Sequence, residues 1–153
     1  MADEKLALLK VLMNDELRIG ELYKIYSSKF PVYKQFWGRL AEQEMAHADN
    51  LRFLCEKAEA GEINFSTAKF NLMAMTAFSG YLSRLITEAD SGIVTVKGAA
   101  AIASDVEKSL IEKKAFELFI TDDQVFISIM KKISSETEEH MRACKELFNQ
   151  VEG

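Results

Sequence analysis

The sequence predicts an all-α protein, a bundle of long helices, and three observations support this fold class. Apolar residues recur at spacings of three and four through most of the chain, which is the period of an α-helix with one buried face. No segment alternates apolar and polar residues as a half-buried strand would. The 153 residues include one proline and seven glycines, so few positions interrupt a helix. With 48% hydrophobic residues, residues 1–153 are expected to form a single domain.

The first expected helix covers residues 3–28. Its apolar stripe contains one acidic residue, Glu16, in the middle, where an apolar residue would be expected. Residues 27–31 break the pattern. Pro31 then suits the first turn of a second helix, because its missing N–H has no helical partner there.

The second helix is expected to run to about residue 60, with Gly61 as its C-terminal stop. Its inner face combines apolar residues with a polar pair, Glu44 and His47. Residues three apart lie on one face of a helix, so this carboxylate and this imidazole can bind the same metal ion.

The remaining helices are expected at residues 66–90, 95–120 and 122–150. Ser66 is the candidate N-cap of the third, which has no acid or histidine at the centre of its face and is interpreted as a connecting helix. Thr121 and Gln124 have the spacing of a capping box at the start of the last helix.

An internal repeat relates the two halves of the chain. Aligning His47 with His140, the only two histidines, superimposes apolar positions of the second and last helices. The octets that begin at Glu16 and Glu112 both have Glu at the first and sixth positions, Leu at the seventh and an aromatic residue at the eighth. Two helix pairs joined by residues 61–95 therefore predict a four-helix bundle with one long helical crossover.

The acidic residues on the expected inner faces indicate a metal site. An unpaired carboxylate in a core costs several kcal/mol, and too few cations point inward to pair them all. A bound metal ion would supply the missing positive charge. One Glu from each of two helices and a Glu-x-x-His from each of the other two is the ligand set of di-iron and di-manganese carboxylate bundles. The candidate metal ligands are Glu16, Glu44, His47, Glu112 and His140.

The chain resembles the rubrerythrin and ferritin-like family over nearly its whole length. The residues that carry the resemblance are Glu16 with Tyr23, Glu44 with His47, residues 111–119, and His140. It implies that Glu16 and Glu112 are carboxylate ligands from the first helix of each pair, and that Glu44, His47 and His140 are ligands from the second. It also implies a ferritin-like four-helix bundle, a homodimer, and a dinuclear iron centre that could also take manganese or zinc. A di-iron peroxidase or other oxidoreductase, or an iron-oxidising protein, is the corresponding function.

Three positions depart from the family pattern. Thr137 occupies the place of a bridging Glu three residues before His140, and Glu136 lies one residue earlier. Glu136 reaches the site if the last helix carries a π-bulge. Otherwise three carboxylates and two imidazoles remain, which hold two metals, one, or none. Phe119 lacks the hydroxyl of Tyr23, and the four cysteines of a rubredoxin-like tail are missing, so electrons would come from a separate protein.

Two functional classes therefore remain open, a redox metalloprotein and a bundle with an incomplete site that acts as a binding module. Net charge −5 without a basic cluster disfavours nucleic-acid binding. The sequence contains no run of 18 or more apolar residues, so it predicts no membrane span. The acidic start at residues 1–5 argues against a secretory signal, so a cytoplasmic location is expected. Cys55 and Cys144 are expected to be core thiols.

Overall fold

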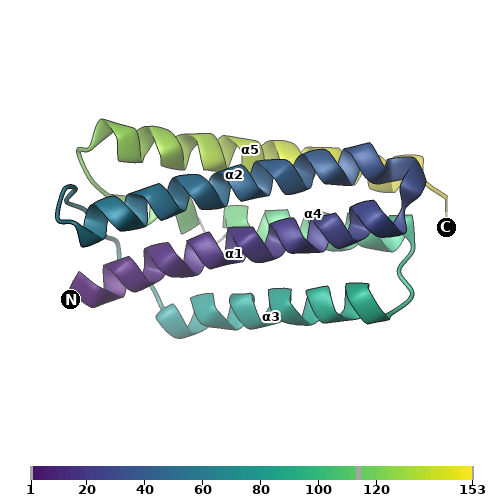
Figure 1. The fold of residues 1–153 in the computed structure, drawn as a ribbon, viewed down its shortest axis with the longest axis horizontal. Helices are drawn as coiled ribbons and strands as arrows, with labels where there is room; N and C mark the ends of the chain where they lie inside the picture. The colour runs from purple at the N-terminus through teal and green to yellow at the C-terminus, as the bar shows by residue number, and fades with distance from the viewer. Residues whose placement is uncertain (1, 113–114, 153) are drawn as a thin grey trace.

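The computed structural model describes residues 2–112 and 115–152, and within them the chain folds into a bundle of five α-helices (Figure 1). The helices are α1 (Ala2–Lys29), α2 (Lys34–Glu59), α3 (Leu72–Ser91), α4 (Val96–Glu112) and α5 (Gln124–Gln150). The predicted all-α, bundle-like fold class is confirmed. None of the described helices is both long enough and apolar enough to cross a membrane.

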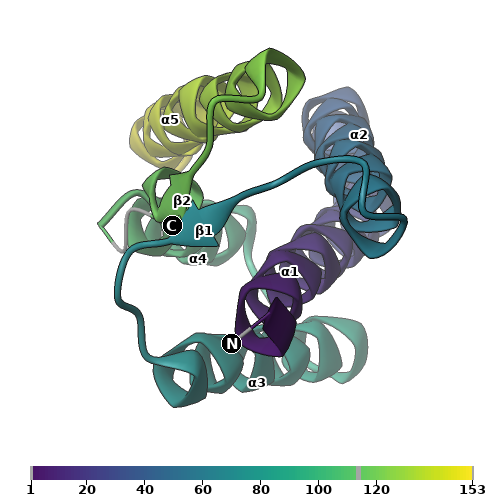
Figure 2. The same cartoon turned by 90° about the vertical axis from the view of Figure 1, so that its left-hand side faces the viewer.

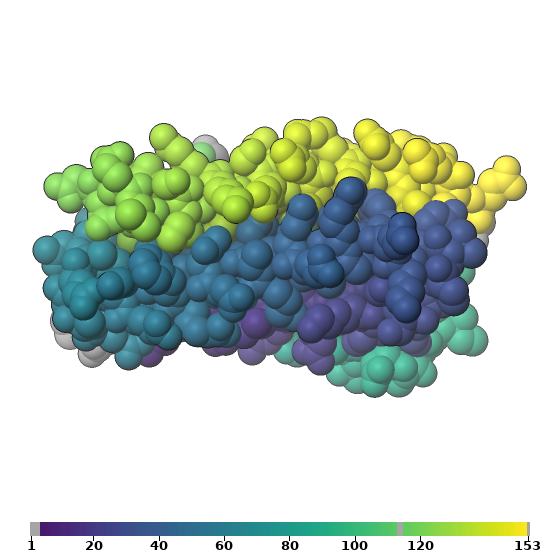
Figure 3. All heavy atoms as spheres, turned by 45° about the horizontal axis from the view of Figure 1, so that its top comes forward, coloured from purple at the N-terminus to yellow at the C-terminus, as the bar shows by residue number. Residues whose placement is uncertain are grey.

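The helices are arranged as two packed pairs and one outer helix. α1 packs along α2 and α4 packs along α5, while α3 lies against α1. Seen end-on, α1, α2, α4 and α5 surround a common centre, and α3 lies outside them (Figure 2). α2 and α5 run side by side along one face of the molecule (Figure 3). Side chains from these four helices can therefore meet in one interior.

The first two helices lie where the sequence predicts them. A short 3-10 helix, Pro31–Tyr33, separates α1 from α2, in keeping with the position of the only proline. α2 ends at Glu59, and Gly61 adopts a left-handed backbone with φ of 73°. Glycine adopts this conformation without steric cost, which is why the helix can stop there.

The connection after α2 differs from the prediction. Residues Ser66–Thr67 form a short strand, β1, which pairs with β2 (Phe119–Ile120) in an antiparallel arrangement. The predicted helix start at Ser66 is therefore wrong. α3 begins six residues later, and the side chain of Asn71 caps it by accepting a hydrogen bond from the backbone N–H of Ala74.

The fourth helix is shorter than predicted. It ends at Glu112, and the expected continuation to residue 120 is replaced by a 3-10 helix, Ala115–Glu117, and by β2. Lys113 and Lys114, which the prediction included, lie outside the described residues. Pairing with β1 takes the backbone hydrogen bonds that a longer helix would have made within itself.

The start of α5 also differs in detail. Asp123, not Thr121, is the N-cap, and its carboxylate accepts a hydrogen bond from the N–H of Phe126. The Thr121 hydroxyl instead donates to the backbone carbonyl of Asn64, 2.8 Å away. This bond joins the segment before α5 to the turn that follows α2.

Gly20 of α1 lies directly against α2. A Cβ atom added to Gly20 would lie 2.8 Å from Cε of Met45 and 3.4 Å from Cβ of Glu44. A little further along, Tyr23 and Tyr26 pack against Trp37, with ring centroids 5.5 and 4.9 Å away, and all three are fully buried. The glycine lets α1 approach α2 at the level of the polar pair on α2.

We predict that Gly20→Val lowers the free energy of unfolding by about 1–3 kcal/mol, because a branched side chain would displace the end of Met45 and crowd Cβ of Glu44. Urea denaturation measures the effect. Gly80→Val is the matched control, since a Cβ at Gly80 meets only Nη1 of Arg84, at 3.8 Å. Equal losses in the two variants would show that close approach at Gly20 is not needed.

Candidate metal centre

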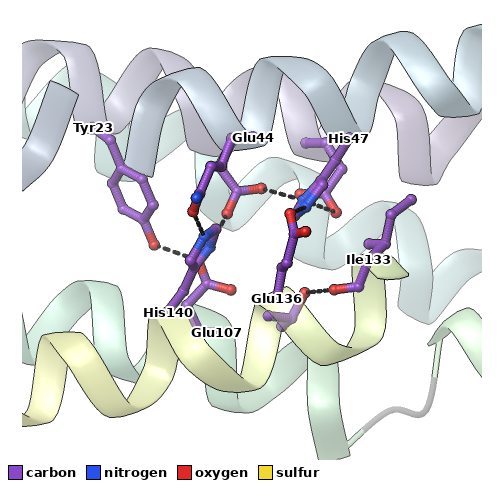
Figure 4. Close-up of polar contacts among 10 residues, drawn as sticks. Tyr23, Glu44, His47, Glu107, Ile133, Glu136 and His140 are labelled. Atoms are coloured by element: carbon purple, nitrogen blue, oxygen red, sulfur yellow. Dashed lines mark hydrogen bonds and ion pairs between the residues drawn. The ribbon is translucent and has the colours of Figure 1, made fainter. Parts of the chain in front are cut away.

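Three carboxylates and two imidazoles meet in the interior of the bundle, and each comes from a position with almost no solvent exposure. They are Glu16 of α1, Glu44 and His47 of α2, Glu107 of α4 and His140 of α5, each at most 2% exposed. Figure 4 shows the side chains of Glu44, His47, Glu107 and His140 pointing toward one another from their helices. The sequence predicted four of the five.

The first group of possible ligands contains Glu16, Glu44 and His47. Nδ1 of His47 lies 3.7 Å from Oε1 of Glu16 and 3.4 Å from Oε2 of Glu44. One donor atom from each residue lies within 4.8 Å of the other two. The predicted i, i+3 pair on α2 is thus completed by the acid from the middle of the α1 stripe.

The second group contains Glu44, Glu107 and His140, and so shares Glu44 with the first. Nδ1 of His140 lies 2.8 Å from Oε1 of Glu44 and 3.4 Å from Oε1 of Glu107. The donor atoms of this group also lie within 4.8 Å of one another. The rings of His47 and His140 are nearly parallel, with centroids 5.8 Å apart. Glu44, with one oxygen toward each histidine, has the position of a bridging ligand.

Glu107 is the ligand candidate that the sequence prediction missed, and Glu112 does not take its place. Glu112 is exposed at the end of α4, with a carboxylate oxygen 3.8 Å from Nζ of Lys108. The octet repeat that selected Glu112 extends into a 3-10 helix and the first residue of β2, so it does not describe a second α-helix equivalent to α1. A usable signal was present: Glu107 belongs to an apolar stripe on α4, formed by Ala99, Ala103, Val106 and Leu110.

Tyr23 holds Glu107 in position. Its hydroxyl donates a hydrogen bond to Oε1 of Glu107 over 2.8 Å, and both groups are fully buried. The expected counterpart of Tyr23, Phe119, lies away from this bond and packs against Phe65 and Phe126. The hydroxyl of Tyr23, in the first half of the chain, therefore hydrogen-bonds to the carboxylate of Glu107, in the second half.

Glu136 of α5 contacts His47 of α2. α5 is regular from Gln124 to Gln150, without a π-bulge, yet Glu136 reaches the site: its Oε1 lies 2.9 Å from Nε2 of His47. Thr137 is buried, and its hydroxyl donates a hydrogen bond to the carbonyl of Ile133 on its own helix. Glu136 contacts the outer nitrogen of a histidine and does not join either group of candidate ligands.

Gln43 has the same relation to the other histidine. Its Oε1 lies 2.5 Å from Nε2 of His140. Both imidazoles therefore direct Nε2 to an oxygen acceptor and Nδ1 to the carboxylates. Since Nε2 must carry a proton to donate to such an acceptor, Nδ1 is the nitrogen available to a metal.

The clustered charges shift the pKa of each acid. Burial raises the pKa of Glu107 to about 8, and the charge of Glu44 adds to the effect. Burial, followed by the charge of Glu44, also raises the pKa of Glu16 well above its usual value. Burial alone would raise the pKa of Glu44, but its close contacts with Glu16 and His47 and its hydrogen bond with His140 hold that pKa well below its usual value. Glu44 is thus the carboxylate that stays ionised when the site holds protons.

Burial alone would lower the pKa of His140, but hydrogen bonds with Glu107 and Glu44 outweigh burial and raise it to about 10. In the metal-free protein, protons therefore supply the positive charge of the cluster. A metal ion can replace them, because its ligands must be deprotonated carboxylates and neutral imidazoles.

Unpartnered polar atoms show that the residues fit a metal. Several buried donor or acceptor atoms of the cluster lack a hydrogen-bond partner among the described residues: both carboxylate oxygens of Glu16, Oε2 of Glu44, Oε2 of Glu107 and Nδ1 of His47. Leaving such an atom unsatisfied costs about 1–3 kcal/mol, and more when it is charged. These atoms are lone-pair donors in the two groups, so metal binding would satisfy them together.

We predict that the metal-free protein loses stability as pH rises from about 5 to about 10. A carboxyl group whose pKa is raised on folding stabilises the fold below its ordinary pKa, and this contribution is lost as pH rises through the folded value, about 8 for Glu107. His140, raised to about 10, extends the loss to higher pH. Urea unfolding in the presence of a chelator measures this dependence.

Glu107→Gln should flatten the lower part of this pH profile, because the amide has no proton to lose. Glu112→Gln, which changes an exposed acid on the same helix, is the control and should follow the unsubstituted protein. A stability that increases with pH over this range would contradict the assignment of protons to the buried cluster.

The geometry of the five buried side chains is what identifies this cluster as a candidate metal centre. No protein-family model matches the chain, and neither the search of curated proteins nor the search of solved structures found a match.

Proposed function

We propose that this protein binds two metal ions, with iron as the best candidate, and uses them in redox chemistry with oxygen or peroxide. The observation that carries the proposal is the pair of buried ligand groups that share Glu44. One ion would be held by Glu16, Glu44 and His47, and the other by Glu44, Glu107 and His140. Each ion would have oxygen and nitrogen donors, and a short carboxylate bridge would connect the two.

The donor set supports iron or manganese, and it also accepts zinc. Carboxylates and imidazoles suit all three metals, whereas no cysteine belongs to either group of ligands. Two iron ions supply the ability to exchange electrons with oxygen or peroxide. The protein's part is to hold them at fixed separation, to keep the site dry, and to balance their charge.

The charge balance supports two divalent ions. Glu16, Glu44 and Glu107 carry three negative charges when ionised, and the carboxylate of Glu136 at His47 adds a fourth. Two divalent ions with neutral imidazoles would make the buried site electrically neutral. A neutral site avoids the large cost of an isolated charge in the interior.

The resemblance of the sequence to the rubrerythrin and ferritin-like family supports the same proposal. If the chain has the fold of this family, α1, α2, α4 and α5 form the four-helix bundle, and the segment containing α3 is the long crossover. The chain has two cysteines, which are too few for a rubredoxin-like centre, so an external protein would supply electrons. A homodimer is the assembly that the resemblance suggests.

We predict that metal-free protein binds two ferrous ions under anaerobic conditions and that Glu44→Gln binds neither, because Glu44 belongs to both groups. His47→Ala and His140→Ala should each retain one ion. Metal analysis after gel filtration gives the stoichiometry. Thermal unfolding should shift upward with metal, since a ligand at 100 times its dissociation constant adds about 2.7 kcal/mol of stability.

Glu112→Gln should bind metal as the unsubstituted protein does, because Glu112 lies outside the cluster. Uptake no greater than that of Glu44→Gln would refute the metalloprotein proposal. It would favour the alternative, a bundle with an incomplete site that acts as a binding module.

A second prediction concerns the chemistry. Ferrous protein mixed with hydrogen peroxide or oxygen should oxidise its iron faster than the same concentration of ferrous iron in buffer, because Glu44 would hold both ions close together. Stopped-flow absorbance follows the ferric product, and a ferrous chelator counts the remaining iron. Bound iron that oxidises no faster than free iron would exclude the redox function and leave metal binding alone.

A further inference from the structure

The outer nitrogens of the two histidines are held by a reciprocal pair of contacts across α2 and α5. Gln43 lies four residues before His47 on α2, and Glu136 lies four residues before His140 on α5. Each of these residues contacts the histidine of the opposite helix: Glu136 meets Nε2 of His47 at 2.9 Å, and Gln43 meets Nε2 of His140 at 2.5 Å. The two contacts are equivalent in position and differ in chemistry.

We propose, on the basis of the function proposed above, that Glu136 and Gln43 are positioning residues that make the two metal positions inequivalent. The His47 position would bind metal more tightly and favour the higher oxidation state. The His140 position would bind more weakly and favour the lower oxidation state. The difference arises from a carboxylate on one side and an amide on the other.

The chemical basis is the hydrogen bond on the nitrogen remote from the metal. When Nδ1 binds a metal, Nε2 keeps its proton and donates it to the facing oxygen. A carboxylate accepts this bond more strongly than a neutral amide does, because the bond is charge-assisted. The stronger bond draws the proton away from the ring of His47, leaves more electron density on its Nδ1, and makes it the better donor.

The two contacts also lie where they can be altered without opening the core. The Glu136 side chain is 22% exposed, whereas those of His47 and His140 are 1% and 2% exposed. Gln43 is likewise only partly buried. Both lie at the junction of α2 and α5, the two helices that run along one face in Figure 3. Exchanging amide and carboxylate there changes charge with little change in volume.

The test isolates each metal position in turn. His140→Ala leaves the His47 position, and His47→Ala leaves the His140 position. Metal-free protein of each kind is titrated with Co²⁺, whose d–d absorption reports both affinity and ligand field. Glu136→Gln and Gln43→Glu are then introduced into each background, and circular dichroism verifies that every variant is folded.

In the unsubstituted background, Co²⁺ should bind in two distinguishable steps. Glu136→Gln should weaken binding about 10–100-fold at the His47 position and leave the His140 position unchanged. Gln43→Glu should strengthen binding at the His140 position only, a gain that a purely structural role would not produce. The double exchange, Glu136→Gln with Gln43→Glu, should reverse the order of the two affinities.

Glu139→Gln is the matched control, because it removes the same charge from an exposed position on the same helix. Two bound ions whose affinities and spectra do not respond to Glu136→Gln or Gln43→Glu would overturn this inference and leave the proposed function standing. An equal loss in Glu139→Gln would also overturn it, since net charge would then explain the effect. Failure of the unsubstituted protein to bind Co²⁺ and ferrous iron would overturn both proposals.

Discussion

The structure depends on enclosing three carboxylates and two imidazoles between four helices without a lysine or arginine beside them among the described residues. An interior of this kind is unfavourable unless protons or metal ions neutralise it. The raised pKa of Glu16 and of Glu107 is the consequence in the metal-free protein. The stability of this helix arrangement therefore depends on the protons or metal ions that neutralise the buried carboxylates.

Local features bring the five side chains together. Gly20 lets α1 approach α2 beside Glu44, and Ala99 and Ala103 of α4 are buried together with Glu107. The hydroxyl of Tyr23 then orients Glu107 from across the bundle. Gly20 and Tyr23 each act through a contact between two helices, α1 with α2 and α1 with α4.

The sequence was sufficient for the first half of the site and insufficient for the second. Pro31 and Gly61 mark the ends of α2, and the i, i+3 spacing of Glu44 and His47 places them on its inner face. In the second half, sequence similarity to the first half selected Glu112. The pairing of β1 with β2, a contact between residues more than 50 positions apart, ends the helical segment and cannot be read from local pattern. The apolar stripe that contains Glu107 was the better guide, because burial follows helical period and not resemblance between segments.

Thr137 and Glu136 are neighbours on α5, but their side chains point in different directions. A one-residue shift turns a side chain by ~100° about the helix. Thr137 faces the interior, where its hydroxyl bonds to its own helix and occupies little space. Glu136 is turned toward α2 and reaches the outer nitrogen of His47. The carboxylate of Glu136 thus lies at the outer nitrogen of a candidate ligand and outside both groups of candidate ligands. The equivalent residue on α2 is Gln43, which contacts Nε2 of His140. The outer nitrogen of His47 therefore faces a carboxylate, whereas that of His140 faces a neutral amide.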